Sequence, residues 1–370
     1  MEFAFSKDQI ALRDAVRNFV RAETPMSVVR EHLEVSEAAG NHLWNAITRL
    51  GWHGLLIPQE FGGIGAGPIE AVAIAEELGA ALHGGPMLAS GMLAPWALAT
   101  LHEPALLNEM IDGSNRWTLA FEENGAGDPV DRIATTAIGR GNDYQLHGVK
   151  IAVIDGHLCD ALIVAARSRD GVRAFAVDAS DATIEFTPNL DLTRKTATIR
   201  FDATRARPLG RDDDQTATWR RINAFGALLL AAEMVGVAAS AHALALEYAT
   251  TREVFGKPLS KFQVTRHKAV DVLREIELAR VGVHAAAWSW SQGFTANTAN
   301  TAAAVSMAKG FAGEAANHSA AECVQVHGGM GYTWECDAHL YLRRAKANDV
   351  LFGTQSWHRS VVTDAYFAAL

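Results

Sequence analysis

The feature that most constrains the fold is the near absence of proline from the last part of the chain. From Arg211 to Leu370 the sequence contains one proline, Pro258, and it is rich in alanine. Proline interrupts helices and alanine favours them, so this stretch predicts long helices. One apolar stripe at helical spacing, with charged residues facing away from it, consists of Ala269, Val272, Leu273, Ile276, Ala279 and Val283. Residues 228–246 are apolar nearly all round, which is typical of a central helix buried in a bundle.

A different pattern occupies the middle of the chain, from about Trp117 to Pro208. Apolar runs there are short, and in residues 197–202 apolar and polar residues alternate, as in a half-buried strand. Two further apolar runs, residues 161–166 and 174–177, flank Asp170-Gly171 and predict a β-hairpin. We therefore expect a β-domain in the middle of the chain.

Helical signals return before this β-domain. Ser6 can cap a first helix, and Gln9 completes a capping box with it. Helical patterns continue through residues 44–50 and 69–82, with a glycine-rich loop between them. The sequence predicts an α+β fold with an N-terminal helical domain (1–115), a middle β-domain (116–210) and a C-terminal helical bundle (211–370).

The charge and the cysteines restrict the class of protein. The chain of 370 residues has a net charge of −9 and no run rich in Lys or Arg, so neither nucleic acid nor a membrane is an expected partner. The first residues, Met1 to Phe5, do not resemble the start of a secretory signal. Three widely spaced cysteines, Cys159, Cys323 and Cys336, indicate reduced thiols and a cytoplasmic location.

Common catalytic motifs are missing from the sequence. It contains no CxxC pair, no HExxH, no GxSxG and no P-loop. The fourteen histidines are scattered, and no group of them has the spacing of metal ligands, so we expect no metal site.

Five segments together resemble the acyl-CoA dehydrogenase family. They are 58–65 (PQEFGGIG), 123–128 (ENGAGD, like E-P-G-A-G-S), 148–156 (GVKIAVIDG, like G-x-K-x-W-I-T-N-G), 252–263 (R-x-x-F-G with a later Gln) and 325–332 (QVHGGMGY, like Q-x-x-G-G-x-G-Y). The resemblance implies a helical domain, a β-domain and a four-helix bundle, assembled as a tetramer. It also implies oxidation of an acyl-CoA thioester: a glutamate takes the α-proton, FAD takes the β-hydride, and an electron-transfer flavoprotein reoxidises the flavin.

The base of that reaction is missing at both places where such enzymes carry it. The usual glutamate lies in a Y-E-G-T motif, and the corresponding residue here is Phe352. Some relatives carry the base near the start of the central bundle helix, and that position falls on Gly226. Residues 222–232 contain no acid at all. We therefore assign no catalytic residue to this chain.

The positions that serve the flavin ring are changed as well. Ala152 and Ile154 replace the tryptophan and threonine of the W-I-T motif, Glu122 replaces a Thr or Ser that contacts the flavin, and Asp128 replaces the serine after G-A-G. A carboxylate at position 122 would be unfavourable beside a reduced, anionic flavin.

The positions that hold the nucleotide half of a neighbour's FAD across the dimer interface are kept. By the resemblance, these positions are Arg252, Phe255, Gln263, Gln325 and Gly329, with Gly328 beside them. The predicted cofactor-binding residues also include Thr354. Arginine suits a pyrophosphate, and glycines allow close approach of the backbone. The hypothesis is a catalytically silent subunit of a heteromeric α2β2 acyl-CoA dehydrogenase, similar to actinobacterial enzymes that act on steroid side-chain or other bulky CoA thioesters.

Two alternatives stay open at the sequence level. The chain is a self-sufficient flavin enzyme if Asp349, three residues before Phe352, acts as a displaced base. It is a CoA-thioester-binding or scaffold protein if it holds no flavin. We interpret Glu233, within an apolar helix, as the partner of an arginine, and Glu247 as an ordinary surface acid.

Overall fold

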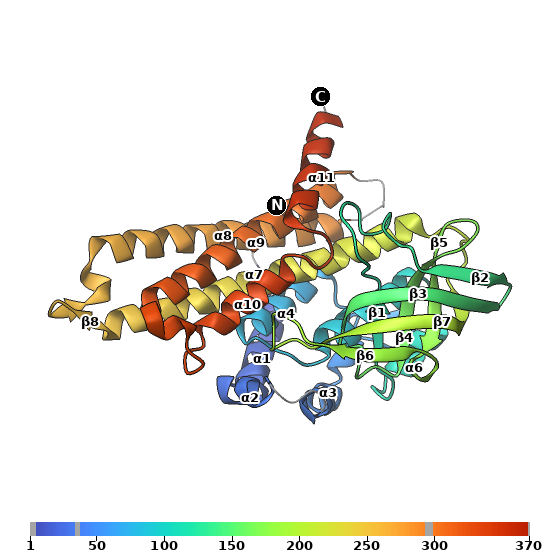
Figure 1. The fold of residues 1–370 in the computed structure, drawn as a ribbon, viewed down its shortest axis with the longest axis horizontal. Helices are drawn as coiled ribbons and strands as arrows, with labels where there is room; N and C mark the ends of the chain where they lie inside the picture. The colour runs from blue at the N-terminus through green and yellow to red at the C-terminus, as the bar shows by residue number, and fades with distance from the viewer. Residues whose placement is uncertain (1–4, 34–37, 293–298, 369–370) are drawn as a thin grey trace.

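The computed structural model describes residues 5–33, 38–292 and 299–368, so the first four residues, part of the segment tested for a secretory signal, lie outside it. The chain begins with helices and continues into a sheet (Figure 1). The α-helices are α1 (Lys7–Glu23), α2 (Met26–Glu31), α3 (Ala38–Arg49), α4 (Pro68–Ala80), α5 (Ala94–Thr100) and α6 (Pro104–Met110). The predicted capping box begins α1, with Ser6 and Gln9 each accepting a hydrogen bond from the other's backbone N–H. A buried π-helical segment, Met87–Leu93, leads into α5.

The middle strands form a sheet that closes on itself. They are β1 (Trp117–Ala120), β2 (Thr136–Arg140), β3 (Asp143–Ile154), β4 (Ala161–Arg167), β5 (Val172–Asp178), β6 (Thr183–Thr187) and β7 (Thr196–Leu209). Pairing runs from β4 through β2, β3, β7 and β5 back to β4, while β1 and β6 lie outside this ring. The predicted hairpin is confirmed, because β4 and β5 pair antiparallel.

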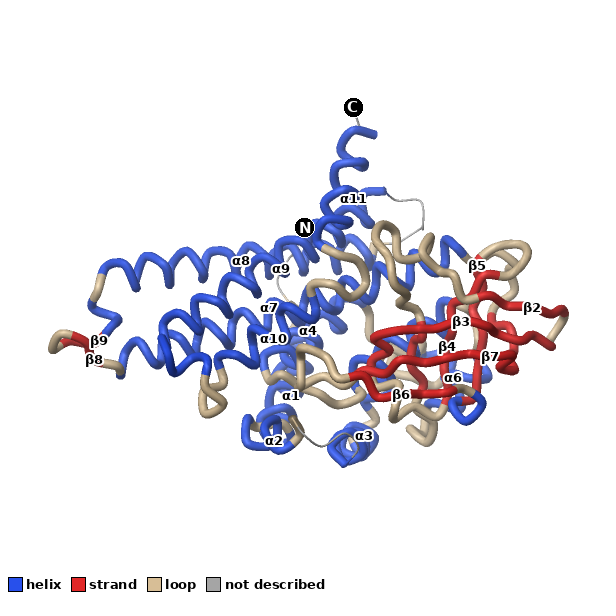
Figure 2. The backbone as a smooth tube through the Cα atoms, viewed as in Figure 1, coloured by secondary structure: helices blue, strands red, loops and turns tan. Residues whose placement is uncertain are grey.

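The C-terminal helices form the bundle. They are α7 (Thr216–Thr251), α8 (Gln263–Ser291), α9 (Ala299–His327), α10 (Ala338–Asn348) and α11 (Gln355–Ala368). The short strands β8 (Glu253–Val254) and β9 (Lys257–Pro258) form a hairpin between α7 and α8. Figure 2 shows this hairpin at one end of the molecule and the β-domain at the other.

Helix α7 is the centre of the molecule. By length and composition it is apolar enough to cross a membrane, but 89% of its most apolar window is buried inside the protein. Two glycines let α4 pack closely against it: a Cβ at Gly79 would lie 2.1 Å from the carbonyl oxygen of Glu233, and one at Gly236 would lie 1.9 Å from that of Glu76. A core helix of a folded domain therefore explains its composition.

A buried ionic network joins the β-domain to the bundle. The Arg194 guanidinium donates to both oxygens of Glu233, at 2.6 and 2.7 Å, and Arg344 donates to Glu233 and to Asp191, each at 2.5 Å. Burial would raise the pKa of Glu233, but the two guanidinium groups lower it overall. The predicted pairing of Glu233 with an arginine is thus confirmed, and Glu247 lies exposed as expected.

Candidate functional site

The positions assigned to the flavin ring and to the base come together between the β-domain and the bundle. Four of them, Glu122, Ala152, Ile154 and Phe352, line a small cavity, which we call the ring-end cavity. Gly226 and Asp128 are not among its lining residues, which are Leu93, Thr118, Leu119, Phe121, Glu122, Ile151, Ala152, Ile154, Leu351 and Phe352. Its volume is about 20 Å³, enough for one water molecule. Ligand sites for molecules of cofactor size hold roughly 300–1,000 Å³. The residues present therefore do not fit an isoalloxazine ring.

The two possible locations of the base lie against each other in space. Gly226 is buried on α7, and Phe352 follows α10 and is 5% exposed. A Cβ placed on Gly226 would lie 2.5 Å from ring carbons of Phe352, closer than real contacts allow. The phenyl ring thus fills the space that the absent side chain of residue 226 leaves, and neither position offers a group that accepts a proton.

Glu122 is the one carboxylate among the ten described residues that line the cavity. Its Oε1 accepts a hydrogen bond of 2.9 Å from the backbone N–H of Phe352, and its Oε2 accepts one of 2.9 Å from Arg132. Burial raises the pKa of Glu122, against the opposing effects of the Phe352 amide and Arg132. The sequence indicates only the charge of this residue, because nothing in it shows that Glu122 reaches the amide of residue 352.

The neighbouring Glu123 has a structural role. Its Oε1 lies 2.5 Å from Nζ of the buried Lys150, and its carboxylate also accepts from the backbone N–H groups of Ala134 and Thr135. Burial lowers the pKa of Lys150 to about 8, although Glu123 acts in the opposite direction. Glu123 therefore ties β3 to the loop between β1 and β2. Asp128 accepts from the backbone N–H of Val130, which fits a residue that caps this loop.

Asp349, the candidate displaced base, is not among the described residues that line the ring-end cavity. A Cβ on Gly313 of α9 would lie 2.7 Å from its Oδ1. The same side of α9 carries the buried Lys309, whose Nζ donates to the carbonyl of Asn348 at 2.8 Å. Burial lowers the pKa of Lys309 to about 8, and the Asp349 carboxylate opposes that shift. Asp349 thus acts as a counter-charge inside the bundle in this structure.

Six of the seven predicted cofactor-binding residues lie together at the opposite end of the bundle. We call this group the hairpin end: Arg252, Phe255, Gln263, Gln325, Gly328 and Gly329. Tyr248, one turn before Arg252, stacks on His327 at 4.3 Å between ring centroids, which brings the end of α7 to the end of α9. All six residues are exposed. A Cβ on either Gly328 or Gly329 would meet nothing within 4 Å.

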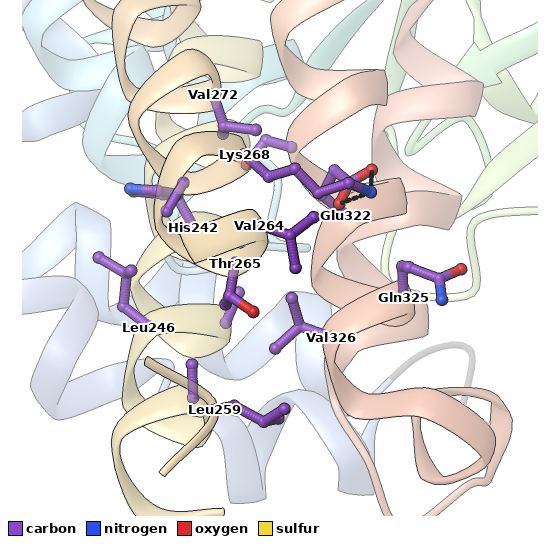
Figure 3. A pocket seen from close by; sticks show the side chains of 14 residues that line it. His242, Leu246, Leu259, Val264, Thr265, Lys268, Val272, Glu322, Gln325 and Val326 are labelled. Carbon is purple, nitrogen blue, oxygen red and sulfur yellow. Dashed lines mark hydrogen bonds and ion pairs between the residues drawn. The ribbon is translucent and has the colours of Figure 1, made fainter. Parts of the chain in front are cut away.

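A pocket of about 250 Å³ lies beside the hairpin end, between α7, α8 and α9. Figure 3 shows Leu246, Leu259, Val264 and Val326 around it, and an ion pair between Lys268 and Glu322 with its shorter contact at 2.9 Å. Gln325 extends from α9 at the side of this pocket (Figure 3). The hairpin end therefore offers exposed polar groups, an apolar hollow and unobstructed backbone, which fit the phosphates and the base of a dinucleotide.

Thr354 lies apart from the other six residues. It follows Phe352 and Gly353 at the end of the molecule that contains the ring-end cavity, which we call the ring end. There its Oγ1 accepts a hydrogen bond of 3.3 Å from the backbone N–H of Trp357 at the start of α11. The structure therefore brings six of the seven predicted cofactor-binding residues together and places Thr354 apart from them. The motif placed Thr354 by its neighbours in sequence, which do not show at which end of the bundle a turn lies.

Comparisons with known proteins agree with the fold and with these motifs. The family model for the acyl-CoA dehydrogenase N-terminal domain matches residues 6–106, and the model for the C-terminal domain of that family matches residues 220–367. Acyl-CoA dehydrogenase IpdE2 of Mycolicibacterium smegmatis is 30% identical over 94% of this chain and 95% of its own length.

Two solved heteromeric structures are similar over almost the whole chain. A variant of the steroid ACAD Tcur3481-Tcur3483 superposes with a TM-score of 0.88 at 28% identity and covers 98% of both chains. The ChsE4-ChsE5 complex of Mycobacterium tuberculosis superposes with a TM-score of 0.87 at 26% identity and covers 99% of both chains.

Proposed function

Because the chain belongs to the acyl-CoA dehydrogenase family, we propose that it is the catalytically incomplete subunit of a heteromeric α2β2 enzyme that desaturates acyl-CoA thioesters. In this proposal a homologous subunit supplies the base and the flavin-ring site. This chain binds the nucleotide half of the partner's FAD, and an electron-transfer flavoprotein accepts the electrons in the cytoplasm. The similarity to a steroid ACAD supports a bulky or steroid side-chain acyl group as the substrate.

The contact between Gly226 and Phe352 carries this proposal. Both places that hold a base in the family are present, adjacent and without a titratable group, and the Phe352 ring fills the space that a side chain at position 226 would need. A phenyl ring cannot remove the α-proton of a thioester, which requires a positioned base. The only carboxylate among the described residues of the cavity, Glu122, is already bound to Arg132 and to the amide of Phe352.

The distance between the two ends supports a flavin shared across subunits. Gly226 lies on α7 and Arg252 is the residue that ends this helix, so at about 1.5 Å per residue they are about 39 Å apart along its axis. An extended FAD does not span that distance. If the hairpin end holds a flavin, the ring of that flavin therefore lies in another subunit. The heteromeric structures to which the chain is similar supply the kind of partner required.

Flavin content is the direct test. The chain is purified alone and after co-expression with a homologue that retains the family's glutamate and W-I-T motif, and protein-bound flavin is measured by its visible absorbance. We expect none with the chain alone and one flavin for every two subunits in the complex. Bound flavin with turnover by the chain alone would favour the self-sufficient enzyme. No flavin in either preparation would favour the scaffold protein.

The alternative with a displaced base has its own test. Asp349→Asn, measured as turnover of the complex and of any flavin-bearing homotetramer, should leave the rate nearly intact, because Asp349 faces Gly313 and not the cavity. Removing a general base lowers rates by roughly a hundredfold or more. A loss of that size, with unchanged flavin content and assembly, would transfer the catalytic role to Asp349.

A further inference from the structure

The backbone of Phe352 is held on both sides by hydrogen bonds to side chains. Its N–H donates to Glu122 Oε1 at 2.9 Å, and its carbonyl oxygen lies 3.1 Å from His358 Nε2. Burial lowers the pKa of His358 to about 3, so its ring is neutral and has one N–H. That N–H donates to Phe352, while Nδ1, 3.0 Å from Ser306 Oγ, accepts from the hydroxyl. Both polar groups of the residue 352 backbone are therefore fully used.

The backbone conformation at this point is unusual for a large side chain. Phe352 has φ +56°, in the left-handed region that bulky residues rarely adopt. The next residue, Gly353, has φ +104°, and a Cβ there would lie 2.4 Å from the ring of Trp357. Such strain persists only where the surroundings impose it. Here the two hydrogen bonds and the fit of the ring over Gly226 impose it.

Glu122 joins the two walls of the ring-end cavity. It belongs to the β-domain side, where Arg132 holds its second oxygen, and Arg132 also donates to the carbonyl of Gly125 at 2.7 Å. Its first oxygen reaches the amide of Phe352 on the bundle side. A carbonyl oxygen bound in this cavity would need a donor such as that amide to stabilise developing negative charge. The Glu122 carboxylate already accepts the hydrogen bond of this amide, so the donor is not available to a ligand.

We propose that Glu122 and Phe352 form a built-in closure of this chain's own flavin-ring site. Phe352 fills the space beside Gly226, and Glu122 takes the backbone donor and bridges the walls. The site therefore excludes both a flavin ring and a thioester carbonyl. The proposal rests on the proposed function and extends it: this subunit is kept silent by a closed site as well as by a missing base, so adding a base alone would not restore activity.

The test is to open the site and measure flavin binding. FAD is titrated into the purified chain alone, and flavin is counted in the complex, for wild type and for Glu122→Thr/Phe352→Ala. Threonine returns a residue that the family's motif carries. We expect the affinity of the chain for FAD to rise by at least about tenfold, and the complex to bind more than one flavin for every two subunits. Glu122→Thr alone should give a smaller gain.

A matched control uses the same residue types at exposed positions of the β-domain. Glu185 and Phe186 are adjacent and exposed on β6, so Glu185→Thr/Phe186→Ala should not change flavin binding. If the variant with Phe352→Ala does not fold, Phe352→Leu is used in its place, because leucine keeps more of the core packing. A folded double variant with wild-type affinity overturns the closure. Failure of the proposed function would give a different result: the wild-type chain alone would bind a stoichiometric amount of flavin. The wild-type complex is measured in parallel so that the two outcomes are separated.

Discussion

Two phenylalanines adopt the same unusual backbone in opposite surroundings. Phe255, in the β8–β9 turn, has φ +52° and is 93% exposed, whereas Phe352 has φ +56° and is 5% exposed. At Phe352 the strain is balanced within the chain by Glu122, His358 and the hollow over Gly226. At Phe255 nothing in the described part of the chain covers the ring. A strained, exposed aromatic is what a surface prepared for another molecule presents.

Glycines at the two ends show the same difference. A Cβ at Gly226 or Gly353 would overlap an aromatic ring, whereas one at Gly328 or Gly329 would meet no atom within 4 Å. The ring end is thus complete and closed within one chain. The hairpin end is open, as we expect of a surface that a second subunit covers in the proposed complex.

The largest expected effect on stability separates the two phenylalanines. Phe352→Ala leaves a cavity in the core and should lower the free energy of unfolding by about 3–5 kcal/mol. Phe255→Ala should change it by less than about 0.5 kcal/mol, because the ring is already in solvent. Urea unfolding of the isolated chain measures both. Equal losses for the two variants would remove the distinction between a closed and an open end.

Asp155 should make the stability of the folded chain dependent on pH. It follows Ile154, takes the place of the asparagine in the W-I-T-N-G motif, and has a buried Oδ1 without a hydrogen-bond partner among the described residues. Burial raises its pKa from 3.8 to about 7, against the effects of Arg194, Arg344 and Arg116. The folded state therefore binds more protons than the unfolded state between these values, and stability falls as the pH rises through them.

Asp155→Asn removes the free-energy cost of ionising this buried carboxyl group. The shift of about three units corresponds to at most about 4 kcal/mol, so the variant should exceed wild type by up to that amount at pH 8 and match it below pH 4. Urea unfolding across this range gives the difference, with the exposed Asp170→Asn as the control for loss of a charge in the same domain. A difference that does not grow with pH would show that Asp155 is not titrating in the core.

Gly226→Ala tests the fit between the two positions of the lost base. Alanine favours a helix over glycine by about 1 kcal/mol, but its Cβ would overlap Phe352, and overpacking costs about 1–3 kcal/mol. We expect a net loss of stability, while Gly329→Ala, with open space around it, should be close to neutral. In the double variant Gly226→Ala/Phe352→Ala the losses should not add, since the two side chains share one space. Additive losses would contradict the contact.

Much of this fold follows from local sequence patterns. The capping box at Ser6, the hairpin at Asp170-Gly171 and the central apolar helix were all predictable, because each depends on residues close together in the chain. The pairing of Glu233 was predictable in kind, since a carboxylate in an apolar helix needs a cation. Its partners, Arg194 and Arg344, come from distant segments and follow only from the tertiary structure.

Sequence motifs indicated which residues stand at the family's site positions, but not how these residues pack. Aligned motifs identified Phe352 and Gly226 separately, and no sequence pattern indicates that one fills the space of the other. The bond from the Phe352 amide to Glu122 spans 230 residues, and the bond to His358 depends on how the chain turns into α11. Such contacts are set by packing, so a sequence shows the residues available for them and not their pairing.

The smallest expected effect on stability is that of substituting Arg252. The same substitution should weaken the retention of the partner's FAD in the proposed complex. The side chain is exposed at the end of α7, so Arg252→Ala should change the free energy of unfolding of the isolated chain by less than about 0.5 kcal/mol. In the complex we expect FAD retention to weaken by roughly 1.5–3 kcal/mol, the contribution of a hydrogen bond to a charged group.

Arg252→Lys is the matched control for this prediction. It keeps the charge but loses the bidentate contact with a pyrophosphate, so its flavin loss should be intermediate. Flavin absorbance after gel filtration, with unfolding of each isolated variant in parallel, separates the two effects, and full flavin retention by Arg252→Ala would place the partner's cofactor elsewhere.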